Sequence, residues 1–106
     1  PRAPRVLLAE DERHLAMLLE QFLIGRGMTV AVAHDGRAAI ALLRGEPWDV
    51  AVVDVQMPGV DGLAVLQAAR AIPLGPEVVL VTGNATLETA GAALRHGAYG
   101  YVAKPY

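Results

Sequence analysis

Short apolar runs alternate along the chain with segments in which apolar residues recur every three or four positions. Runs of a few apolar, often β-branched residues without strict polar alternation are typical of strands covered on both faces. The five runs cover residues 5–9, 29–33, 48–54, 77–82 and 100–103. The pattern therefore predicts five buried strands.

The segments that follow the first four runs carry a helical pattern. The clearest one has its apolar residues at positions i, i+3, i+4, i+7 and i+8, namely Leu15, Leu18, Leu19, Phe22 and Leu23. Shorter patterns cover residues 39–43, 62–71 and 90–97, and Gly or Pro residues mark the helix ends. We expect Asp35 to cap the second helix and Asp61 to serve the turn before the third.

Strand and helix patterns alternate strictly, which is typical of α/β proteins. Parallel strands joined by right-handed crossovers then form a doubly wound sheet with helices on both faces. No repeat or linker interrupts the pattern, so residues 1–106 are interpreted as one domain. The sequence stops where a fifth helix would begin, and the final helix is therefore expected to be missing from this chain.

Composition narrows the function classes. Of the 106 residues, 54% are hydrophobic and 19% are charged, which favours a globular chain over a disordered one. A net charge of −2 without a basic run argues against direct binding of nucleic acid. The absence of cysteine excludes disulfides and thiolate metal sites. No apolar stretch is long enough to span a membrane, so we expect a cytoplasmic protein; a first residue other than Met indicates a processed or recombinant fragment.

Polar residues stand at the carboxyl ends of four predicted strands. Glu10 and Asp11 follow the first strand, Asp54 ends the third, Thr82 ends the fourth, and Lys104 follows the fifth. In an open α/β sheet these ends meet at one edge, where ligands bind. Taken alone, Asp54 has two readings: it caps the next turn, or it belongs to a site. Its four companions favour the site.

Three carboxylates close together repel one another unless a cation is present. Glu10, Asp11 and Asp54 offer only oxygen ligands, which suit a hard ion such as Mg²⁺. The backbone carbonyl of Gln56, two residues beyond Asp54, would add a further oxygen.

The same set fits phosphoryl transfer to Asp54. Aspartyl phosphates are established covalent intermediates, and a metal with Lys104 would offset charge on the transferred group, to which the Thr82 hydroxyl would donate. No Ser-His-Asp arrangement and no GxxxxGK[ST] loop is present. We expect His14, His34 and His96 to be solvated, since none falls on the carboxylate edge. The predicted chemistry therefore rests on the three carboxylates, Lys104 and Thr82.

Four motifs carry a resemblance to a known family: AED at 9–11, DVQMPGVDG at 54–62, VTGNA at 81–85 and GAYGYVAKP at 97–105. Together they closely resemble the receiver domains of two-component response regulators, over essentially the whole chain. The resemblance implies a flavodoxin-like sheet with strand order 2-1-3-4-5.

By that resemblance, Asp54 accepts a phosphoryl group from the phosphohistidine of a sensor histidine kinase or phosphotransfer protein. Glu10 and Asp11 hold Mg²⁺, and Lys104 pairs with the phosphoryl group. The domain is then a signalling phosphoacceptor, not an enzyme, since it assists only its own phosphorylation and dephosphorylation. Glu10 replaces the commoner Asp, which lengthens one ligand arm.

The resemblance also implies a switch formed by Thr82 and Tyr101. The Thr82 hydroxyl moves towards the phosphate and the Tyr101 ring follows inward. The surface formed by the fourth predicted helix and the fifth predicted strand (helix 4 and strand 5) then changes to control an output domain or partner. A homodimer through that face is possible in this reading. The run TGNATLETA is also similar to receivers attached to enhancer-binding transcription activators. A cis bond before Pro105 would help to position the Lys104 ammonium.

Two alternatives stay open. A phosphatase of the haloacid-dehalogenase type also has a nucleophilic Asp beside Mg²⁺. It requires a second Asp as general acid two residues after the nucleophile, where this chain has Gln56. A receiver-like interaction module would keep the fold and work without phosphate.

Overall fold

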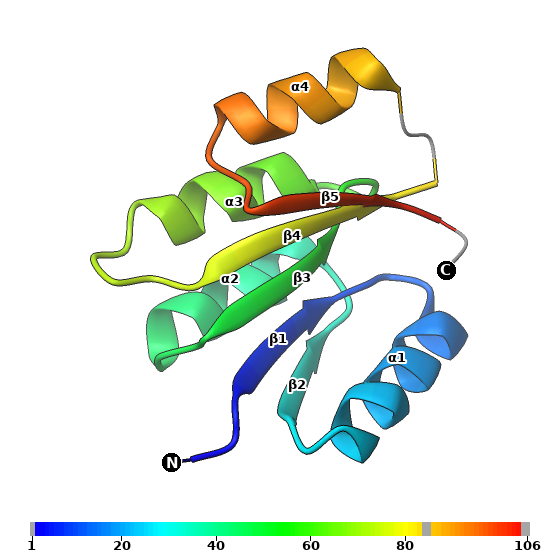
Figure 1. Ribbon diagram of the computed structural model, residues 1–106, viewed down its shortest axis with the longest axis vertical. Helices are drawn as coiled ribbons and strands as arrows, with labels where there is room; N and C mark the ends of the chain where they lie inside the picture. Colours follow the sequence, from blue (N-terminus) through cyan, green and yellow to red (C-terminus); the bar gives the residue numbers. More distant parts are fainter. Residues whose placement is uncertain (1, 84–85, 105–106) are drawn as a thin grey trace.

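The protein is described from a computed structural model, which places residues 2–83 and 86–104. These residues form one parallel five-stranded sheet of order β2-β1-β3-β4-β5 with helices on both faces (Figure 1). In chain order the elements are β1 (Arg5–Ala9), α1 (Arg13–Gly25), β2 (Thr29–Ala33), α2 (Gly36–Gly45), β3 (Val50–Asp54), α3 (Gly62–Arg70), β4 (Glu77–Thr82), α4 (Leu87–Arg95) and β5 (Gly100–Ala103). The predicted fold class and strand order are confirmed.

One strand begins later than predicted. Residues 48–54 were expected to form the third strand, whereas β3 begins at Val50. The Asp49 carboxylate accepts a hydrogen bond from the backbone N–H of Arg5 at 2.7 Å, and the Trp48 ring is buried with its Nε1 donating to the Leu42 carbonyl at 2.8 Å. These side-chain contacts hold Trp48 and Asp49 just before β3, where the Asp49 backbone also bonds Arg5 and Glu77 at 2.9 and 3.3 Å. The third helix ends at Arg70, one residue before the predicted end.

Side-chain caps begin the helices, as the sequence predicted for Asp35, while Asp61 was expected only to serve a turn. Asp35 accepts from the Ala38 N–H and begins α2, and Asp61 accepts from the Ala64 N–H and begins α3. Glu12 caps α1 in the same way. Each cap satisfies N–H groups that the helix leaves unpaired, so the loops at the carboxyl edge of the sheet are anchored where the helices start.

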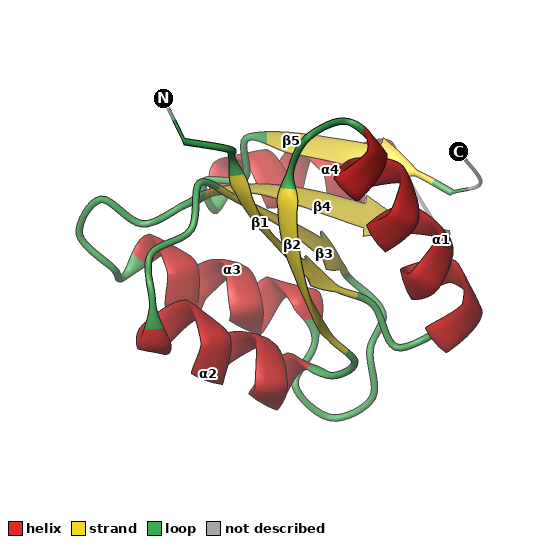
Figure 2. Cartoon of the chain, turned by 90° about the horizontal axis from the view of Figure 1, so that it is seen from below, coloured by secondary structure: helices red, strands yellow, loops and turns green. Residues whose placement is uncertain are grey.

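The two faces of the sheet are covered unequally. Helices α2, α3 and α4 contribute to one buried cluster with the strands, whereas α1 packs on the opposite face (Figure 2). On the α1 face an apolar groove lies between this helix and β5; its lining residues are Leu8, Leu19, Phe22, Leu23, Val52, Val79, Val81 and Val102. Within the described part of the chain, no helix is long and apolar enough to cross a membrane.

Gly62 brings α3 close to the end of β3. A Cβ at this position would lie 2.4 Å from the Asp54 carbonyl oxygen, so only glycine allows the approach. The Gly62 N–H also donates to the Val55 carbonyl at 3.0 Å. The start of α3 thus buttresses the strand end that carries Asp54. The predicted cis bond before Pro105 lies outside the described residues, as do Asn84 and Ala85 of the VTGNA motif.

Candidate functional site

Three carboxylates meet at the carboxyl edge of the sheet. Oxygens of Glu10, Asp11 and Asp54 all lie within 4.8 Å of one another. Glu10 and Asp54 are only 2% and 4% exposed, and Asp11 is half-buried. The register explains the meeting: Ala9 of β1 pairs with Val53 of β3, so the residue after each comes to the same point of the edge. Parallel pairing therefore gathers the acids that the sequence separates by more than forty positions.

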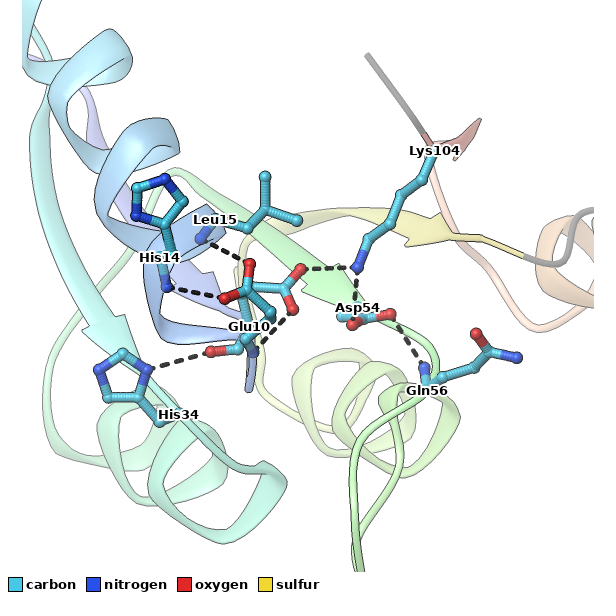
Figure 3. Close-up of polar contacts among 8 residues, drawn as sticks. Glu10, His14, Leu15, His34, Asp54, Gln56 and Lys104 are labelled. Carbon is cyan, nitrogen blue, oxygen red and sulfur yellow. Dashed lines mark hydrogen bonds and ion pairs between the residues drawn. The ribbon is translucent and has the colours of Figure 1, made fainter.

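Lys104 brings a cation to these acids from the far edge strand. Its Nζ lies 2.9 Å from Glu10 Oε1 and 3.0 Å from Asp54 Oδ2, so one ammonium joins two carboxylates (Figure 3). The Lys104 backbone N–H donates to the Thr82 carbonyl at 2.7 Å and fixes the root of the side chain against β4. One positive charge thus faces three negative ones.

Burial and the neighbouring charges shift the pKa values of Glu10 and Lys104. Burial raises the pKa of the Glu10 carboxyl; the Asp54 charge adds to this, while the hydrogen bond from Lys104 works against it. Burial works to lower the pKa of Lys104, but its hydrogen bonds to Glu10 and Asp54 outweigh burial and raise it. The ammonium stays charged, and the acids remain under-compensated.

The donor set fits a hard divalent cation. All three side chains offer carboxylate oxygens, and no hydrogen bond or ion pair within the described residues engages the Asp11 carboxylate. Such oxygens are the ligands that Mg²⁺ takes in proteins. Gln56 lies beside them, with its backbone N–H donating to Asp54 Oδ1 at 3.0 Å. A cation here would offset the surplus negative charge of the three carboxylates.

Comparison with known proteins decides the family. The family model of the response regulator receiver domain matches residues 6–106. The chain belongs to this family. A curated relative of this receiver domain, the transcriptional regulatory protein TctD of Salmonella typhimurium, is 41% identical over 102 residues, which are 96% of this chain and 46% of TctD. The receiver domain thus spans less than half the length of that relative.

Solved structures agree with this assignment. A response regulator from Burkholderia pseudomallei with a phosphorylated aspartic acid and a calcium ion has a TM-score of 0.88 at 29% identity, covering 97% of this chain and 61% of that one. The response regulator TrrA of Thermotoga maritima, in complex with Mg²⁺ and BeF, has a TM-score of 0.86 at 25% identity, covering 97% and 88%. Receiver domains of this family bind Mg²⁺ at an acidic pocket, and response regulators work with histidine kinases.

Thr82 and Tyr101 lie on neighbouring strands of this receiver domain. Thr82 ends β4 and is 2% exposed. Tyr101, on β5, is half-buried against the core, and its hydroxyl lies 2.7 Å from Thr89 Oγ1 on α4. The sequence did not predict this contact, because it depends on how α4 lies across β5. Thr89 also forms the capping box of α4 with Thr86, so the Tyr101 hydroxyl contacts the first turn of that helix.

His34 corrects one expectation. His14 and His96 are exposed as predicted, but His34 is half-buried, and its Nδ1 lies 3.1 Å from the Glu10 carbonyl oxygen. The prediction that no histidine falls on the carboxylate edge was wrong. Ala9 pairs with Ala33, so His34 stands beside Glu10 where the strands end. The register of β1 on β2 was the signal that would have revealed it.

Proposed function

We propose that this receiver domain takes up a phosphoryl group on Asp54, in a Mg²⁺-dependent reaction, from a sensor histidine kinase or phosphotransfer protein. The observation that carries the proposal is the buried Asp54 carboxylate, held by the Gln56 N–H at 3.0 Å and by Lys104 at 3.0 Å, beside the oxygens of Glu10 and Asp11. Two fixed contacts orient the nucleophile, and the neighbouring acids form the metal pocket.

In the transfer, an Asp54 oxygen forms a bond to phosphorus while the bond to the donor nitrogen breaks. The electron pair stays on that nitrogen, which becomes part of a neutral imidazole. Lys104 is near enough to pair with a phosphoryl oxygen, and Thr82 at the end of β4 would donate its hydroxyl to another. Mg²⁺ bound by Glu10, Asp11, Asp54 and the Gln56 carbonyl would offset charge on the transferred group.

Access to Asp54 supports a large donor. Gly83 follows Thr82 and is exposed, and a Cβ built on it meets nothing within 4 Å. The absence of a side chain at this position leaves the approach open to a partner's imidazole, and to water in the slow hydrolysis that would reset the domain. The domain acts only on its own phosphorylation state in this account and turns over no separate substrate.

Phosphorylation would be read out through α4 and β5. The modification adds about −1.5 to −2 charge and new acceptor oxygens, towards which Thr82 and Lys104 would move. Tyr101 follows in this account, and its hydroxyl would leave Thr89 on α4. The α4–β5 surface then changes and controls an output domain, a partner or a homodimer. TctD is named as a transcriptional regulatory protein, which supports transcription as the output.

Two alternatives are less favoured. A haloacid-dehalogenase-type phosphatase needs a second acid two residues after the nucleophile, and Gln56 stands there. A phosphate-independent module would need none of the charges that the fold buries. Turnover of a phosphate ester by the isolated domain would support the first, and partner binding unchanged by Asp54→Asn would support the second.

The test is the intact-protein mass after incubation with acetyl phosphate, with and without Mg²⁺, for the wild-type chain and Asp54→Asn. We expect one phosphoryl adduct that requires Mg²⁺ and is absent from the variant. Asp61→Asn, a loop acid outside the cluster, is the matched control and should keep the adduct. An adduct that persists in Asp54→Asn, or none in the wild-type chain, would overturn the proposal.

A further inference from the structure

His34 makes a contact that the phosphoacceptor chemistry alone does not explain. It is the residue after β2, and its ring lies half-buried beside the loop that joins β1 to α1. Its Nδ1 is 3.1 Å from the Glu10 backbone oxygen, on the side of that loop away from Lys104 (Figure 3). A carbonyl oxygen only accepts, so the proton of this hydrogen bond belongs to Nδ1.

The contacted carbonyl belongs to the peptide that joins Glu10 to Asp11. Because a peptide unit is planar, fixing its oxygen fixes the orientation of the whole plane and the place of the Asp11 Cα, from which the side chain leaves the backbone. The Glu10 N–H is already held by the Ala33 carbonyl at 3.0 Å. The His34 ring therefore fixes the next peptide along, beyond the last strand ladder bond.

The two acids of this loop differ in how much they depend on the backbone. The Glu10 carboxylate has its own contacts, from Lys104 at 2.9 Å and from the Glu12 N–H at 3.1 Å. No hydrogen bond or ion pair in the described ranges engages the Asp11 carboxylate. The position of Asp11 is thus set by its backbone: the His34 ring holds the peptide before it, and the Glu10 carboxylate holds the peptide after it.

We propose that His34 is a positioning residue for the metal pocket, whose Nδ1–H holds the Glu10 carbonyl and thereby aims the Asp11 carboxylate at the cation. This inference rests on the proposed function for its biological meaning. It predicts a loss of Mg²⁺ affinity when the donor is removed, because partners that orient metal ligands typically change affinity by about 10- to 100-fold when mutated.

The test compares three variants that separate the donor from the bulk of the ring. His34→Leu keeps apolar bulk and removes the donor. His34→Asn places an amide nitrogen as many bonds from Cβ as Nδ1, so it restores the donor, and His34→Gln places it one bond farther out. His96→Asn, at an exposed histidine, is the control. The measurement is an NMR titration with MgCl2, following the backbone amide signals of residues 10–12.

For His34→Leu we expect half-saturation at about tenfold higher Mg²⁺, and for His34→Asn within about threefold of wild type. His34→Gln should fall between them, and His96→Asn should match the wild-type chain. At saturating Mg²⁺ the rate of adduct formation should recover in every variant. Unchanged half-saturation in His34→Leu, or no rescue by His34→Asn, would overturn the role; if His34→Leu does not fold, the Asn and Gln pair decides.

The Mg²⁺ titration and the phosphoryl adduct test the role of His34 and the proposed function independently. A chain that binds Mg²⁺ but takes no phosphoryl group would refute the proposed function, while the variants would still test His34. A wild-type chain whose signals do not respond to Mg²⁺ would overturn the role of His34 directly.

Discussion

The two edges of the sheet both gather acidic and basic side chains, but they balance them differently. At the amino edge Arg2 pairs with Asp49 at 2.9 Å, and Arg5 pairs with Glu46, all at least partly exposed. Arg5 also lies over the Trp48 ring, 4.6 Å from its centroid. Two bases thus meet two acids, in water.

At the carboxyl edge one lysine meets three acids, two of them buried. Exposed ion pairs contribute little, and buried charges are costly unless compensated. The charges of the amino edge are therefore balanced and at least partly exposed, whereas the carboxyl edge has a surplus of buried negative charge that a bound cation would offset. Reactive chemistry is therefore expected where charged side chains are buried and acids outnumber bases, rather than where charged side chains are most numerous.

Removing the Lys104 ammonium from the carboxyl edge should have the largest effect on stability. Lys104→Met leaves the buried Glu10 and Asp54 carboxylates without an opposite charge, and we expect the free energy of unfolding to fall by about 2–3 kcal/mol without Mg²⁺. This is less than for a fully buried pair, because Lys104 is 21% exposed. Added Mg²⁺ should restore part of the loss. Urea denaturation measures it.

Arg2→Met is the matched change at the amino edge and should alter the free energy of unfolding only slightly. If the two variants lose equal stability, the contrast between the edges is wrong.

The pH dependence should differ between the edges. Burial raises the Glu10 pKa above its ordinary 4.5, so between that value and the raised one the folded chain holds a proton that the unfolded chain has released, and stability falls as pH rises. The Arg5 backbone N–H, with Arg2, lowers the Asp49 pKa below 3.8; its contribution is present above pH 3.8 and is lost as pH falls through the lowered value.

Urea denaturation across acidic to neutral pH, without metal, measures both effects. Glu10→Gln should flatten the decline above about pH 4.5, and Asp49→Asn should flatten the loss at the acidic end. Identical curves for the two variants would contradict the assignment of opposite pKa directions.

The smallest effect is expected at the α4–β5 surface. Tyr101→Phe keeps the ring and removes the hydroxyl that contacts Thr89, so the free energy of unfolding should fall by about 0.5–1 kcal/mol. Hydrogen exchange of the first-turn amides of α4 should quicken, while amides of α1 should keep their rates. Unchanged exchange in α4 would show that the contact does not link the strand to the helix.

The apolar pattern was sufficient for much of the fold. Buried strands and amphipathic helices differ in period, so the five strands and four helices could be located, and the acids at strand ends could be placed on one edge. The strand order came from the resemblance, because periodicity does not state which strands pair. The start of β3 was placed two residues too early, since Trp48 donates to the Leu42 carbonyl and Asp49 binds Arg5 through its carboxylate as well as its backbone.

The contacts that escaped prediction depend on register and helix placement. His34 looked like a solvated residue after a strand, and only the pairing of Ala9 with Ala33 brings it to Glu10. The bond between Tyr101 and Thr89 needs the position of α4 on β5. Local sequence identifies what an edge contains, and tertiary pairing decides which of its members touch.

The central claim is that the carboxyl edge, where acids outnumber bases, is the reactive one. Locating the phosphoryl group tests this claim most directly. After treatment with acetyl phosphate and Mg²⁺, borohydride reduction converts an aspartyl phosphate to homoserine, and peptide mass spectrometry finds its position. The tryptic peptide between Arg44 and Arg70 contains Asp49, Asp54 and Asp61, one acid from each setting. The account predicts homoserine at position 54 alone. Homoserine at position 49 or 61, with position 54 unmodified, would contradict it.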